Sequence, residues 1–410
     1  MLLRNYKYRL YPSKKHLGRL NTQLALCQEL YNLLLQKCRE RHKNEKKAMS
    51  KAELCRLIKE VKNSDPRFDQ IYSQVLQNIS DRLIKAYRNF FRRVKEKKSG
   101  KKIQVGFPRF KNFYRSATYP QFGFSMVSEK RLHLAKIGDI PIVLHRLPKG
   151  KVKTLTVKRN QTGKWFAVMS CVIDEDDNEE KKPRSAHTLS VQNREIGIDV
   201  GIESFATLSN GEKIQNPRLL IMSEKKLKRW QRKLSRKAKN SANRKKARVR
   251  LAKIHERITD QRADFLHKLS KKLSEDYDLM AVENLNVAGM MRWHLSKHIS
   301  DASWNRFIQM LTYKASSAGG KVICVNPEGT TQECSGCGRI VKKTLAVRKH
   351  SCPDCGLSID RDHNSAINIL KRAKSTAGPA GTDACGNLAS TPPFREGASQ
   401  IEEAGTRRDK

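Results

Sequence analysis

Two cysteine pairs in the last quarter of the chain constrain its fold more than any other feature. They are Cys334-x-x-Cys337 and Cys352-x-x-Cys355, with fourteen residues between them. Four thiolates on two tight turns are the ligand set of a tetrahedral Zn²⁺ ion, and glycines after each pair, in "CSGCG" and "CPDCG", let the backbone turn around it. A redox dithiol is the alternative, which two matched pairs disfavour. The sequence therefore predicts one structural zinc ion that takes no part in chemistry.

Three carboxylates occur where an unpaired charge would be costly. Asp199 interrupts the apolar strand "IGIDVGI", Glu283 closes the strand "LMAVENLN", and Asp362 lies in "IDRDHNSAINIL", ahead of a helix. A buried acid is unfavourable unless it binds something. Three carboxylates that converge on a mixed α/β core can hold two Mg²⁺ ions for phosphodiester hydrolysis. We therefore predict that Asp199, Glu283 and Asp362 are catalytic and are the Mg²⁺ ligands.

Each of these acids also has a structural interpretation as a strand-end acid or a helix cap. Asp362 in particular could cap a helix that begins near Asn364. Asp360, two residues earlier, could assist Asp362, and the sequence leaves its role open.

The charge of the chain predicts a polyanionic partner. There are 84 Lys and Arg against 40 Asp and Glu, for a net charge of +44. Such a surplus repels itself unless an anion neutralises it, which makes nucleic acid the expected partner. Residues 223–257 alone hold sixteen basic against two acidic residues, with apolar positions at helical spacing. They predict an antiparallel helix pair with a basic face, which is either a nucleic-acid contact or an ordinary solvated surface.

The expected cellular setting is the cytoplasm. Outside the two pairs, the other six cysteines are isolated in the sequence and are read as lone thiols, which is typical of a reducing compartment. The N-terminal "MLLRNYKYRLYP" has no apolar run that suits a signal peptide, and the chain has no stretch of about 18 consecutive apolar residues. We therefore predict an intracellular protein without a membrane segment.

Periodicity divides the chain into several parts. A strand at "YKYRLYP" is followed by helical spacing over residues 12–98, and short β-type runs then extend to Ile173. The polar "DEDDNEEKKPRSAHTLSVQNR" indicates a linker, and strands alternate with helices from Glu195 onward. The composition of residues 374–410 is typical of disorder. The fold class predicted is multidomain α/β.

At these motifs the sequence resembles the TnpB family, transposon-encoded relatives of type V CRISPR effectors. The resemblance extends over most of the chain, through "YKYRLYP", "GFPRFKN", "GIDVGI", "VENLNVAGM", "TTQECSGCG", "CPDCG" and "DRDHNSAINIL". It implies a β-barrel wedge domain in residues 1–11 and 99–180, interrupted by a helical recognition domain in 12–98. It further implies a RuvC-type, RNase H-like nuclease domain in 181–330 and 358–373, with a zinc ribbon inserted at 331–357.

The resemblance also implies the activity and the partners. Family members use a guide RNA from the transposon end, which pairs with one strand of double-stranded target DNA beside a short transposon-adjacent motif that the protein reads. By motif match, Asp199, Glu283 and Asp362 take the catalytic positions in a prokaryotic cytoplasmic enzyme. Gln77, Thr118 and Tyr119 are candidate readers of the motif: Gln77 could bond adenine edges and Tyr119 could stack on a base. Structural packing explains these residues equally well.

Two other functions are open. A non-cleaving RNA-guided DNA-binding regulator would be expected to lack catalytic acids, whereas all three are present. A DNA transposase also uses an RNase H-like triad, but its acid order ends in Glu. The chain contains no GxxxxGK[ST] phosphate loop, so ATP-driven unwinding is not expected.

Overall fold

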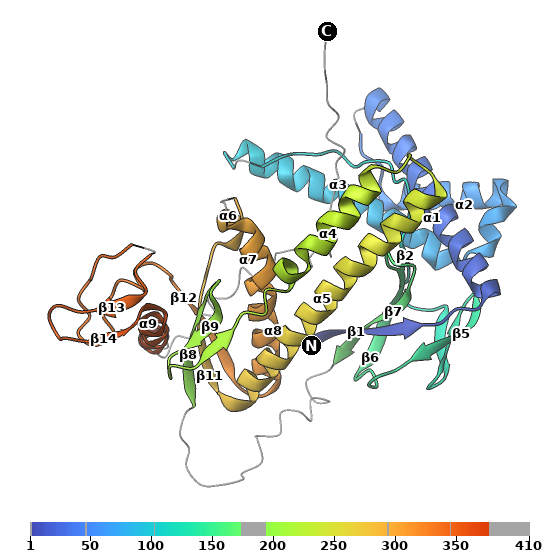
Figure 1. The fold of residues 1–410 in the computed structure, drawn as a ribbon. Coiled ribbons are helices and arrows are strands. Elements are labelled where there is room, and N and C mark those ends of the chain that lie inside the picture. The colour runs from blue at the N-terminus through green and yellow to red at the C-terminus, as the bar shows by residue number, and fades with distance from the viewer. Residues whose placement is uncertain are drawn as a thin grey trace. The chain divides into compact units, whose positions relative to one another are not determined.

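The computed structural model describes residues 2–45, 47–101, 103–173, 194–292, 295–344 and 346–376. They belong to two compact units, Met1–Glu179 and Glu180–Lys410 (Figure 1). Residues 174–193 of the expected linker and residues 377–410 of the expected disordered tail lie outside the described residues.

Seven strands form one antiparallel sheet in the first unit, in the order β2-β6-β7-β1-β5-β4-β3. They are β1 (Leu2–Leu10), β2 (Ser116–Tyr119), β3 (Phe124–Ser128), β4 (Arg131–Leu134), β5 (Gly138–Val143), β6 (Lys151–Arg159) and β7 (Trp165–Ile173). β1 pairs with β7 along its whole length, so the helices that follow β1 are an insertion into the β-structure. β2 and β3 do not pair with each other among the described residues, and closure into a barrel stays a prediction.

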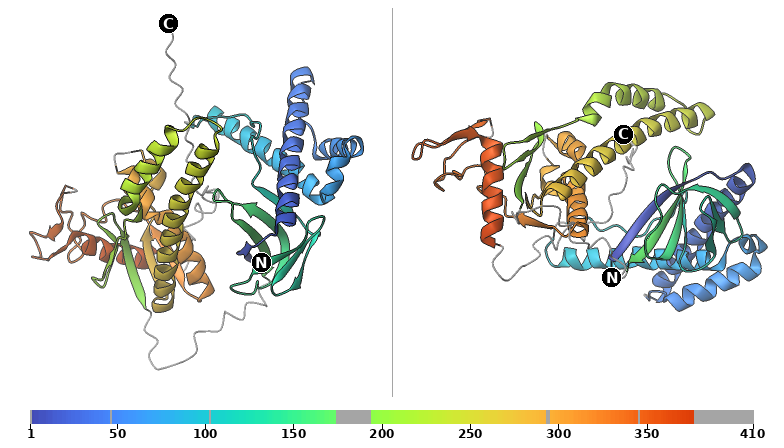
Figure 2. Two further views of the ribbon diagram at one scale, coloured as in Figure 1. Left: turned by 45° about the vertical axis from the view of Figure 1, so that its right-hand side comes forward. Right: turned by 90° about the horizontal axis from the view of Figure 1, so that it is seen from below.

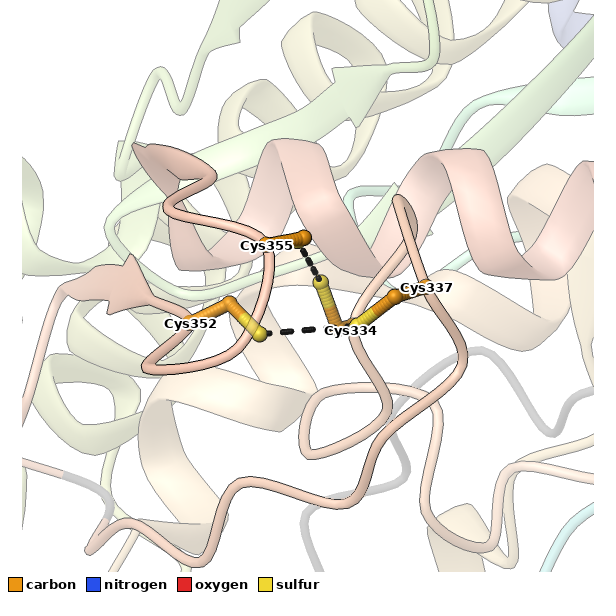
Figure 3. A group of neighbouring side chains, drawn as sticks. All are labelled: Cys334, Cys337, Cys352 and Cys355. Carbon is orange, nitrogen blue, oxygen red and sulfur yellow. Dashed lines mark hydrogen bonds between the residues drawn. The ribbon is translucent and has the colours of Figure 1, made fainter.

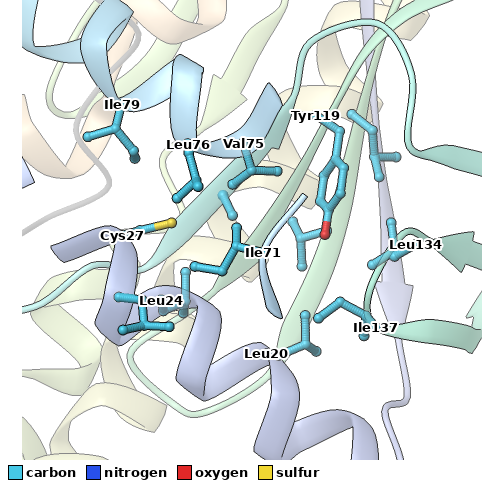
Figure 4. Close-up of a cluster of buried hydrophobic side chains, with 14 of the residues drawn as sticks. Leu20, Leu24, Cys27, Ile71, Val75, Leu76, Ile79, Tyr119, Leu134 and Ile137 are labelled. Atoms are coloured by element: carbon cyan, nitrogen blue, oxygen red, sulfur yellow. The ribbon is translucent and has the colours of Figure 1, made fainter. Parts of the chain in front are cut away.

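The helices of the first unit share one core with this sheet. They are α1 (Lys14–Glu45), α2 (Lys51–Ser64), the 3₁₀ helix η1 (Pro66–Gln70) and α3 (Ser73–Lys98). Apolar side chains at helical spacing on α1, such as Leu20 and Leu24, meet Val75 and Ile79 of α3 and Leu134 of the sheet (Figure 4). α2 begins at a capping box, in which Ser50 and Glu53 bond each other's backbone N–H groups.

The second unit is built on a five-stranded mixed sheet in the order β10-β9-β8-β11-β12. Its strands are β8 (Glu195–Val200), β9 (Ser204–Leu208), β10 (Lys213–Gln215), β11 (Leu279–Glu283) and β12 (Lys321–Val325). β11 runs parallel to both β8 and β12, whereas β9 is antiparallel to β8. Its helices are α4 (Leu219–Ser235), α5 (Ala242–Asp276), α6 (Val287–Met290), α7 (Ser296–Ala302), α8 (Trp304–Ser317) and α9 (Arg361–Thr376).

Helices cover both faces of this sheet, which makes its central strands buried on both sides (Figures 1 and 2). Ile196 and Ile198 of β8 pack with α5 and α8 through residues such as Leu273 and Phe307. Alternate positions of the strands face α9, where Ile369 packs with neighbouring strand residues. The alternation therefore assigns Gly197 and Asp199, which lie between the isoleucines, to the α9 face.

The predicted helix pair in the basic segment is present. α4 and α5 pack through a small apolar cluster of Leu227, Leu234, Ala247, Leu251 and Ile258. α5 then continues into the core of the sheet through Leu266, Leu269 and Leu273. The hairpin is thus one continuous extension of the core of the second unit, because α5 takes part in both clusters.

Two observations bear on the expected cellular setting. No helix in the described ranges combines the length and the apolar character needed to cross a membrane. Cys27, Cys38, Cys55 and Cys171 are free thiols, but Cys324 on β12 is disulfide-bonded. The expectation of a lone thiol is therefore wrong at Cys324, because spacing along the sequence does not show which cysteines meet in space.

Candidate catalytic and metal sites

Strand register places two of the predicted acids side by side. In the parallel pairing of β8 with β11, Ile198 lies opposite Val282, and the next residues are Asp199 and Glu283. Equivalent positions of parallel neighbours point to the same face of the sheet. Both carboxylates therefore emerge on the face that α9 covers, at the carboxyl ends of the two strands.

Gly197 determines how closely α9 approaches this face. A Cβ atom at Gly197 would lie 2.0 Å from the carbonyl oxygen of Ala366 and 3.0 Å from the Cβ atom of Leu370. Glycine in a strand interior often marks such an approach of another backbone. Because Asp199 lies two residues further along β8, the same contact brings the first turn of α9, with Asp362, toward Asp199.

The roles of Asp360 and Asp362 are distinct in the structure. α9 begins at Arg361, and the Asp360 carboxylate accepts the backbone N–H groups of Asp362 at 3.0 Å and His363 at 3.2 Å. Asp360 also pairs with Lys213 at 2.7 Å. Asp360 is thus the cap, and the interpretation of Asp362 as the cap is wrong because the helix starts three residues earlier than expected. The Asp362 carboxylate contacts Arg361 at 2.9 Å.

The three acids repel one another. Burial first, and then the charges of Glu283 and Asp362, raise the pKa of Asp199 well above its usual range, while Arg361 and the Ser365 hydroxyl oppose this. Burial also raises the pKa of Glu283, against the Thr330 hydroxyl and Arg372, which lower it. A buried carboxylate whose pKa is raised by two neighbouring carboxylates marks a site that a cation would stabilise.

The donor set fits Mg²⁺. All three groups offer carboxylate oxygens, the ligands that this ion prefers. Their oxygens do not all lie within 4.8 Å of one another, since among the described residues only the four cysteines form such a group. Ligands of one Mg²⁺ ion lie about 2.0–2.1 Å from it, so the three carboxylates as placed here do not form the closed ligand set of a single ion.

The four cysteines are brought together as predicted. Their sulfurs all lie within 4.8 Å, with 3.6 Å between Cys334 and Cys355 and 3.5 Å between Cys337 and Cys352 (Figure 3). A tetrahedral zinc ion with Zn–S bonds of about 2.3 Å spaces its sulfurs at roughly 3.8 Å, close to this arrangement. The cysteines therefore fit Zn²⁺.

The cysteine turns lie between β12 and α9. The short strands β13 (Lys349–Ser351) and β14 (Ser358–Asp360) pair on either side of the second turn, and β14 leads directly into α9. The segment with the two cysteine turns thus ends at Asp360, which caps the helix of Asp362.

Replacing Cys352 with serine should remove the zinc and lower the melting temperature. Loss of one of four ligands opens the site, and the contribution of the bound metal to folding is lost with it. Zinc content by mass spectrometry of metals, together with a thermal melt, checks this. Cys55→Ser, at a free thiol outside the cluster, is the matched control and should keep the metal; equal zinc in both variants would contradict the site.

Sequence reasoning missed three polar residues around these sites. Thr330 is buried and donates to Glu283, and Asn364 and Asn368 are buried on α9 and bond the backbone before the first cysteine pair. Asparagines four residues apart among alanine and isoleucine in "HNSAINIL" were a usable signal, because a buried amide requires partners. Nothing in the sequence around Thr330 indicates its partner.

The basic hairpin carries a shallow hollow on α4 that is lined only by cations. Its volume is about 390 Å³, and its lining residues are Lys225, Lys228, Arg229, Arg232, Lys233 and Arg236. They follow three- and four-residue spacing and so lie on one helix face. Lys228 pairs with Glu224 at 3.0 Å, and a phosphate backbone would be complementary to the other cations of the hollow.

The candidate motif readers differ in their exposure. Tyr119 is fully buried, donates to Gln23 at 3.2 Å and stacks on Tyr72, so its ring is not available to a base. The packing interpretation therefore holds for Tyr119. Thr118 is partly buried and bonds Arg82 at 2.8 Å, whereas Gln77 on α3 is exposed. Gln77 stays a candidate, and so does Thr118 with its Arg82 contact.

Several known proteins are similar in sequence to this chain over much of its length. A "Putative RNA-guided DNA endonuclease" of Streptomyces pristinaespiralis is 34% identical over 377 residues, 90% of this chain and 88% of that protein. A TnpB-like protein of Acanthamoeba polyphaga mimivirus is 30% identical over 200 residues, 45% of this chain and 38% of that protein. The chain belongs to the TnpB family. InsQ of Escherichia coli (strain K12), which carries the same endonuclease name, is 29% identical over 90% of this chain and 92% of its own length.

Family models match three parts of this TnpB-family chain. Residues 172–294 match a model described as "Probable transposase", and residues 304–369 match "Cas12f1-like, TNB domain". Residues 1–47 match "Helix-turn-helix domain", although here they form β1 and the single helix α1. A cryo-EM structure of a Cas12f1–sgRNA–target DNA complex is similar at 15% identity, over 90% of this chain and 99% of that one, with a TM-score of 0.33.

Proposed function

We propose that this chain is a Mg²⁺-dependent, RNA-guided DNA endonuclease that cuts double-stranded DNA beside a short transposon-adjacent motif. The observation that carries the proposal is the convergence of Asp199 and Glu283 on neighbouring strands with Asp362 on the helix packed over them. The relatives named as RNA-guided DNA endonucleases, which align over about nine-tenths of this chain, support the same activity.

The chain's own residues define what the site can do. Asp199, Glu283 and Asp362 would hold two Mg²⁺ ions, which supply an activated water and stabilise the leaving oxygen of a phosphodiester. The Thr330 hydroxyl fixes one oxygen of Glu283, and Arg361 fixes one oxygen of Asp362. The apolar core on both sides of the sheet keeps the carboxylates in place as charge builds on the phosphate.

The partners follow from the charge and the relatives. A guide RNA from the transposon end would select the target by base pairing, while the protein would read only the adjacent motif, with Gln77 and Thr118 as candidate readers. We propose four domains for this chain. They are a wedge domain in residues 1–11 and 99–180, a recognition domain in 12–98, a RuvC-like nuclease in 181–330 and 358–373, and a zinc ribbon in 331–357. The proposed location is the prokaryotic cytoplasm.

Binding of the guide and the target should weaken steeply with salt, and α4 should carry part of that dependence. Replacing Arg229, Arg232 and Arg236 with glutamine should lower the slope of log affinity against log salt by about 2 to 3, because each phosphate contact contributes roughly 0.7–0.9. Filter binding of guide RNA between low and physiological ionic strength measures the slope.

A matched control removes the same number of charges elsewhere. Lys37, Lys62 and Lys268 each pair with a neighbouring carboxylate on the surface. Their replacement with glutamine should leave the slope close to that of the unaltered protein. Equal slopes for both triple variants would mean that α4 is a solvated surface.

Cleavage of a plasmid library tests the proposed function. The protein is co-expressed with the nucleic acid that flanks its gene, and the plasmids carry a guide-matched target next to randomised flanks. Mg²⁺-dependent cutting with one enriched flank is the expected result. Binding to the target without cutting would favour the regulator, and the absence of copurifying RNA would favour the transposase that one family model names.

A further inference from the structure

Thr330 makes a direct contact with a predicted catalytic carboxylate. Its hydroxyl lies 2.6 Å from Oε1 of Glu283, and both residues are buried, with exposed fractions of 1% and 7%. The same hydroxyl is 3.1 Å from the carbonyl oxygen of Pro327. A hydroxyl has one proton, and the shorter contact to the ionised group is the stronger bond, so Thr330 donates to Glu283.

The backbone of Thr330 is held by α9. Nδ2 of Asn368 donates to the carbonyl oxygen of Thr330 at 3.0 Å and to that of Glu333 at 2.7 Å. Asn368 is buried, with 2% of its surface exposed, so these bonds replace contacts that water would otherwise make. The turn with Thr330 is therefore fixed to the helix whose first turn carries Asp362.

The same helix holds the first cysteine turn. Asn364 donates to the carbonyl oxygen of Glu333 at 2.7 Å and accepts the backbone N–H of Ser335 at 2.9 Å, which brackets Cys334 on both sides. Asn364 is fully buried. Cys334 follows Thr330 by four residues, and between them the backbone N–H groups of Gln332 and Glu333 donate to the carbonyl oxygen of Gly329 at 3.0 and 2.9 Å.

We propose that Thr330 is a positioning residue, whose hydroxyl fixes the Glu283 carboxylate for metal binding and whose own place is fixed by Asn368 and the zinc turn. The zinc site then acts on the chemistry without touching the substrate. It orders the four residues before Cys334, and these orient one oxygen of Glu283, leaving the other free for the cation. This inference rests on the proposed nuclease function.

Two variants separate the hydroxyl from the shape of the side chain. Thr330→Val keeps the volume and removes the donor, and we expect cleavage to fall about 10- to 100-fold, as for a lost hydrogen bond to a charged group. Thr330→Ser keeps the donor and should restore most of the rate. Thr331→Val, at the adjacent half-buried threonine, is the matched control and should cleave at the unaltered rate.

A metal-binding measurement gives a readout that does not depend on cleavage. Binding of Mn²⁺ to the full chain without nucleic acid, followed by electron paramagnetic resonance, should weaken for Thr330→Val and stay close to the unaltered value for Thr330→Ser. Zinc content and melting temperature should be alike in all variants. A purely structural role would lower the melting temperature without this difference in Mn²⁺ affinity between Val and Ser.

The outcomes distinguish this inference from the proposed function. One outcome is that Thr330→Val cleaves DNA and binds Mn²⁺ as well as the unaltered protein does, while Glu283→Gln does not cleave. That result would leave the proposed catalytic site intact and overturn the role of Thr330. Equal losses in Thr330→Val and Thr330→Ser would overturn it as well, because the hydroxyl would not be the cause. Cleavage by Glu283→Gln would instead overturn the proposed catalytic site.

Discussion

A single methyl group at Gly197 should lower DNA cleavage by roughly 100-fold and destabilise the second unit. The Cβ atom of Gly197→Ala would lie 2.0 Å from the carbonyl oxygen of Ala366, a distance at which the backbone of α9 must move. Overpacking of this kind costs typically about 1–3 kcal/mol, and more where backbone resists. Displacement of α9 also carries Asp362 away from Asp199, and positioning errors of about 1 Å can cost roughly 100-fold in rate.

The matched control is the same methyl group in open space. Gly18 lies inside α1, and a Cβ atom there has no heavy atom within 4 Å. Gly18→Ala should leave cleavage unchanged and stabilise the helix by up to about 1 kcal/mol. Thermal melts and cleavage rates of both variants provide the comparison. Cleavage by Gly197→Ala at the unaltered rate would mean that the close approach of α9 is not needed.

The two aspartates at the start of α9 should differ sharply in their effect on cleavage. Asp362→Asn would remove one of the proposed Mg²⁺-binding oxygens and should reduce cleavage by at least about 1,000-fold, which corresponds to about 4 kcal/mol of transition-state stabilisation. Asp360→Asn keeps a side chain that caps helices as well as aspartate does, so most of the activity should remain. Single-turnover cleavage of guide-matched DNA measures both.

The comparison of the two variants tests the role of Asp360, which the sequence leaves open. Asp360 accepts two backbone N–H groups and pairs with Lys213, which defines it as a cap. If Asp360→Asn were as inactive as Asp362→Asn, Asp360 would have to contact the metal or the substrate, and its structural assignment would be wrong. Melting temperatures of the two variants show whether either loss arises from unfolding.

Much of the second unit could be predicted because its signals are local. Runs of apolar residues predict buried strands. A single acid in such a run, as at Asp199 and Glu283, is unusual and indicates a metal or catalytic site. The cysteine spacing predicts the zinc turns in the same way. What brings Asp199 next to Glu283 is the parallel register of β8 and β11, which depends on tertiary packing and has no sequence signal.

The misses have physical causes. Tyr119 was a candidate to stack on a base, but β2 is an edge strand whose alternate residues face the core, and Tyr119 is one of these. The start of α9 could not be located because Asp360 and Asp362 both suit a cap, and only backbone geometry distinguishes them. Thr330 was missed because its hydroxyl bond reaches across 47 residues to Glu283.

The central claim is that Asp199, Glu283 and Asp362 cut DNA that an RNA selects. The most direct measurement compares cleavage of one guide-matched DNA by two complexes of equal RNA content, one with the unaltered protein and one with Glu283→Gln. We expect Mg²⁺-dependent cutting by the first and, at equal occupancy of the target, none by the second. Equal cleavage by both complexes would contradict the catalytic assignment.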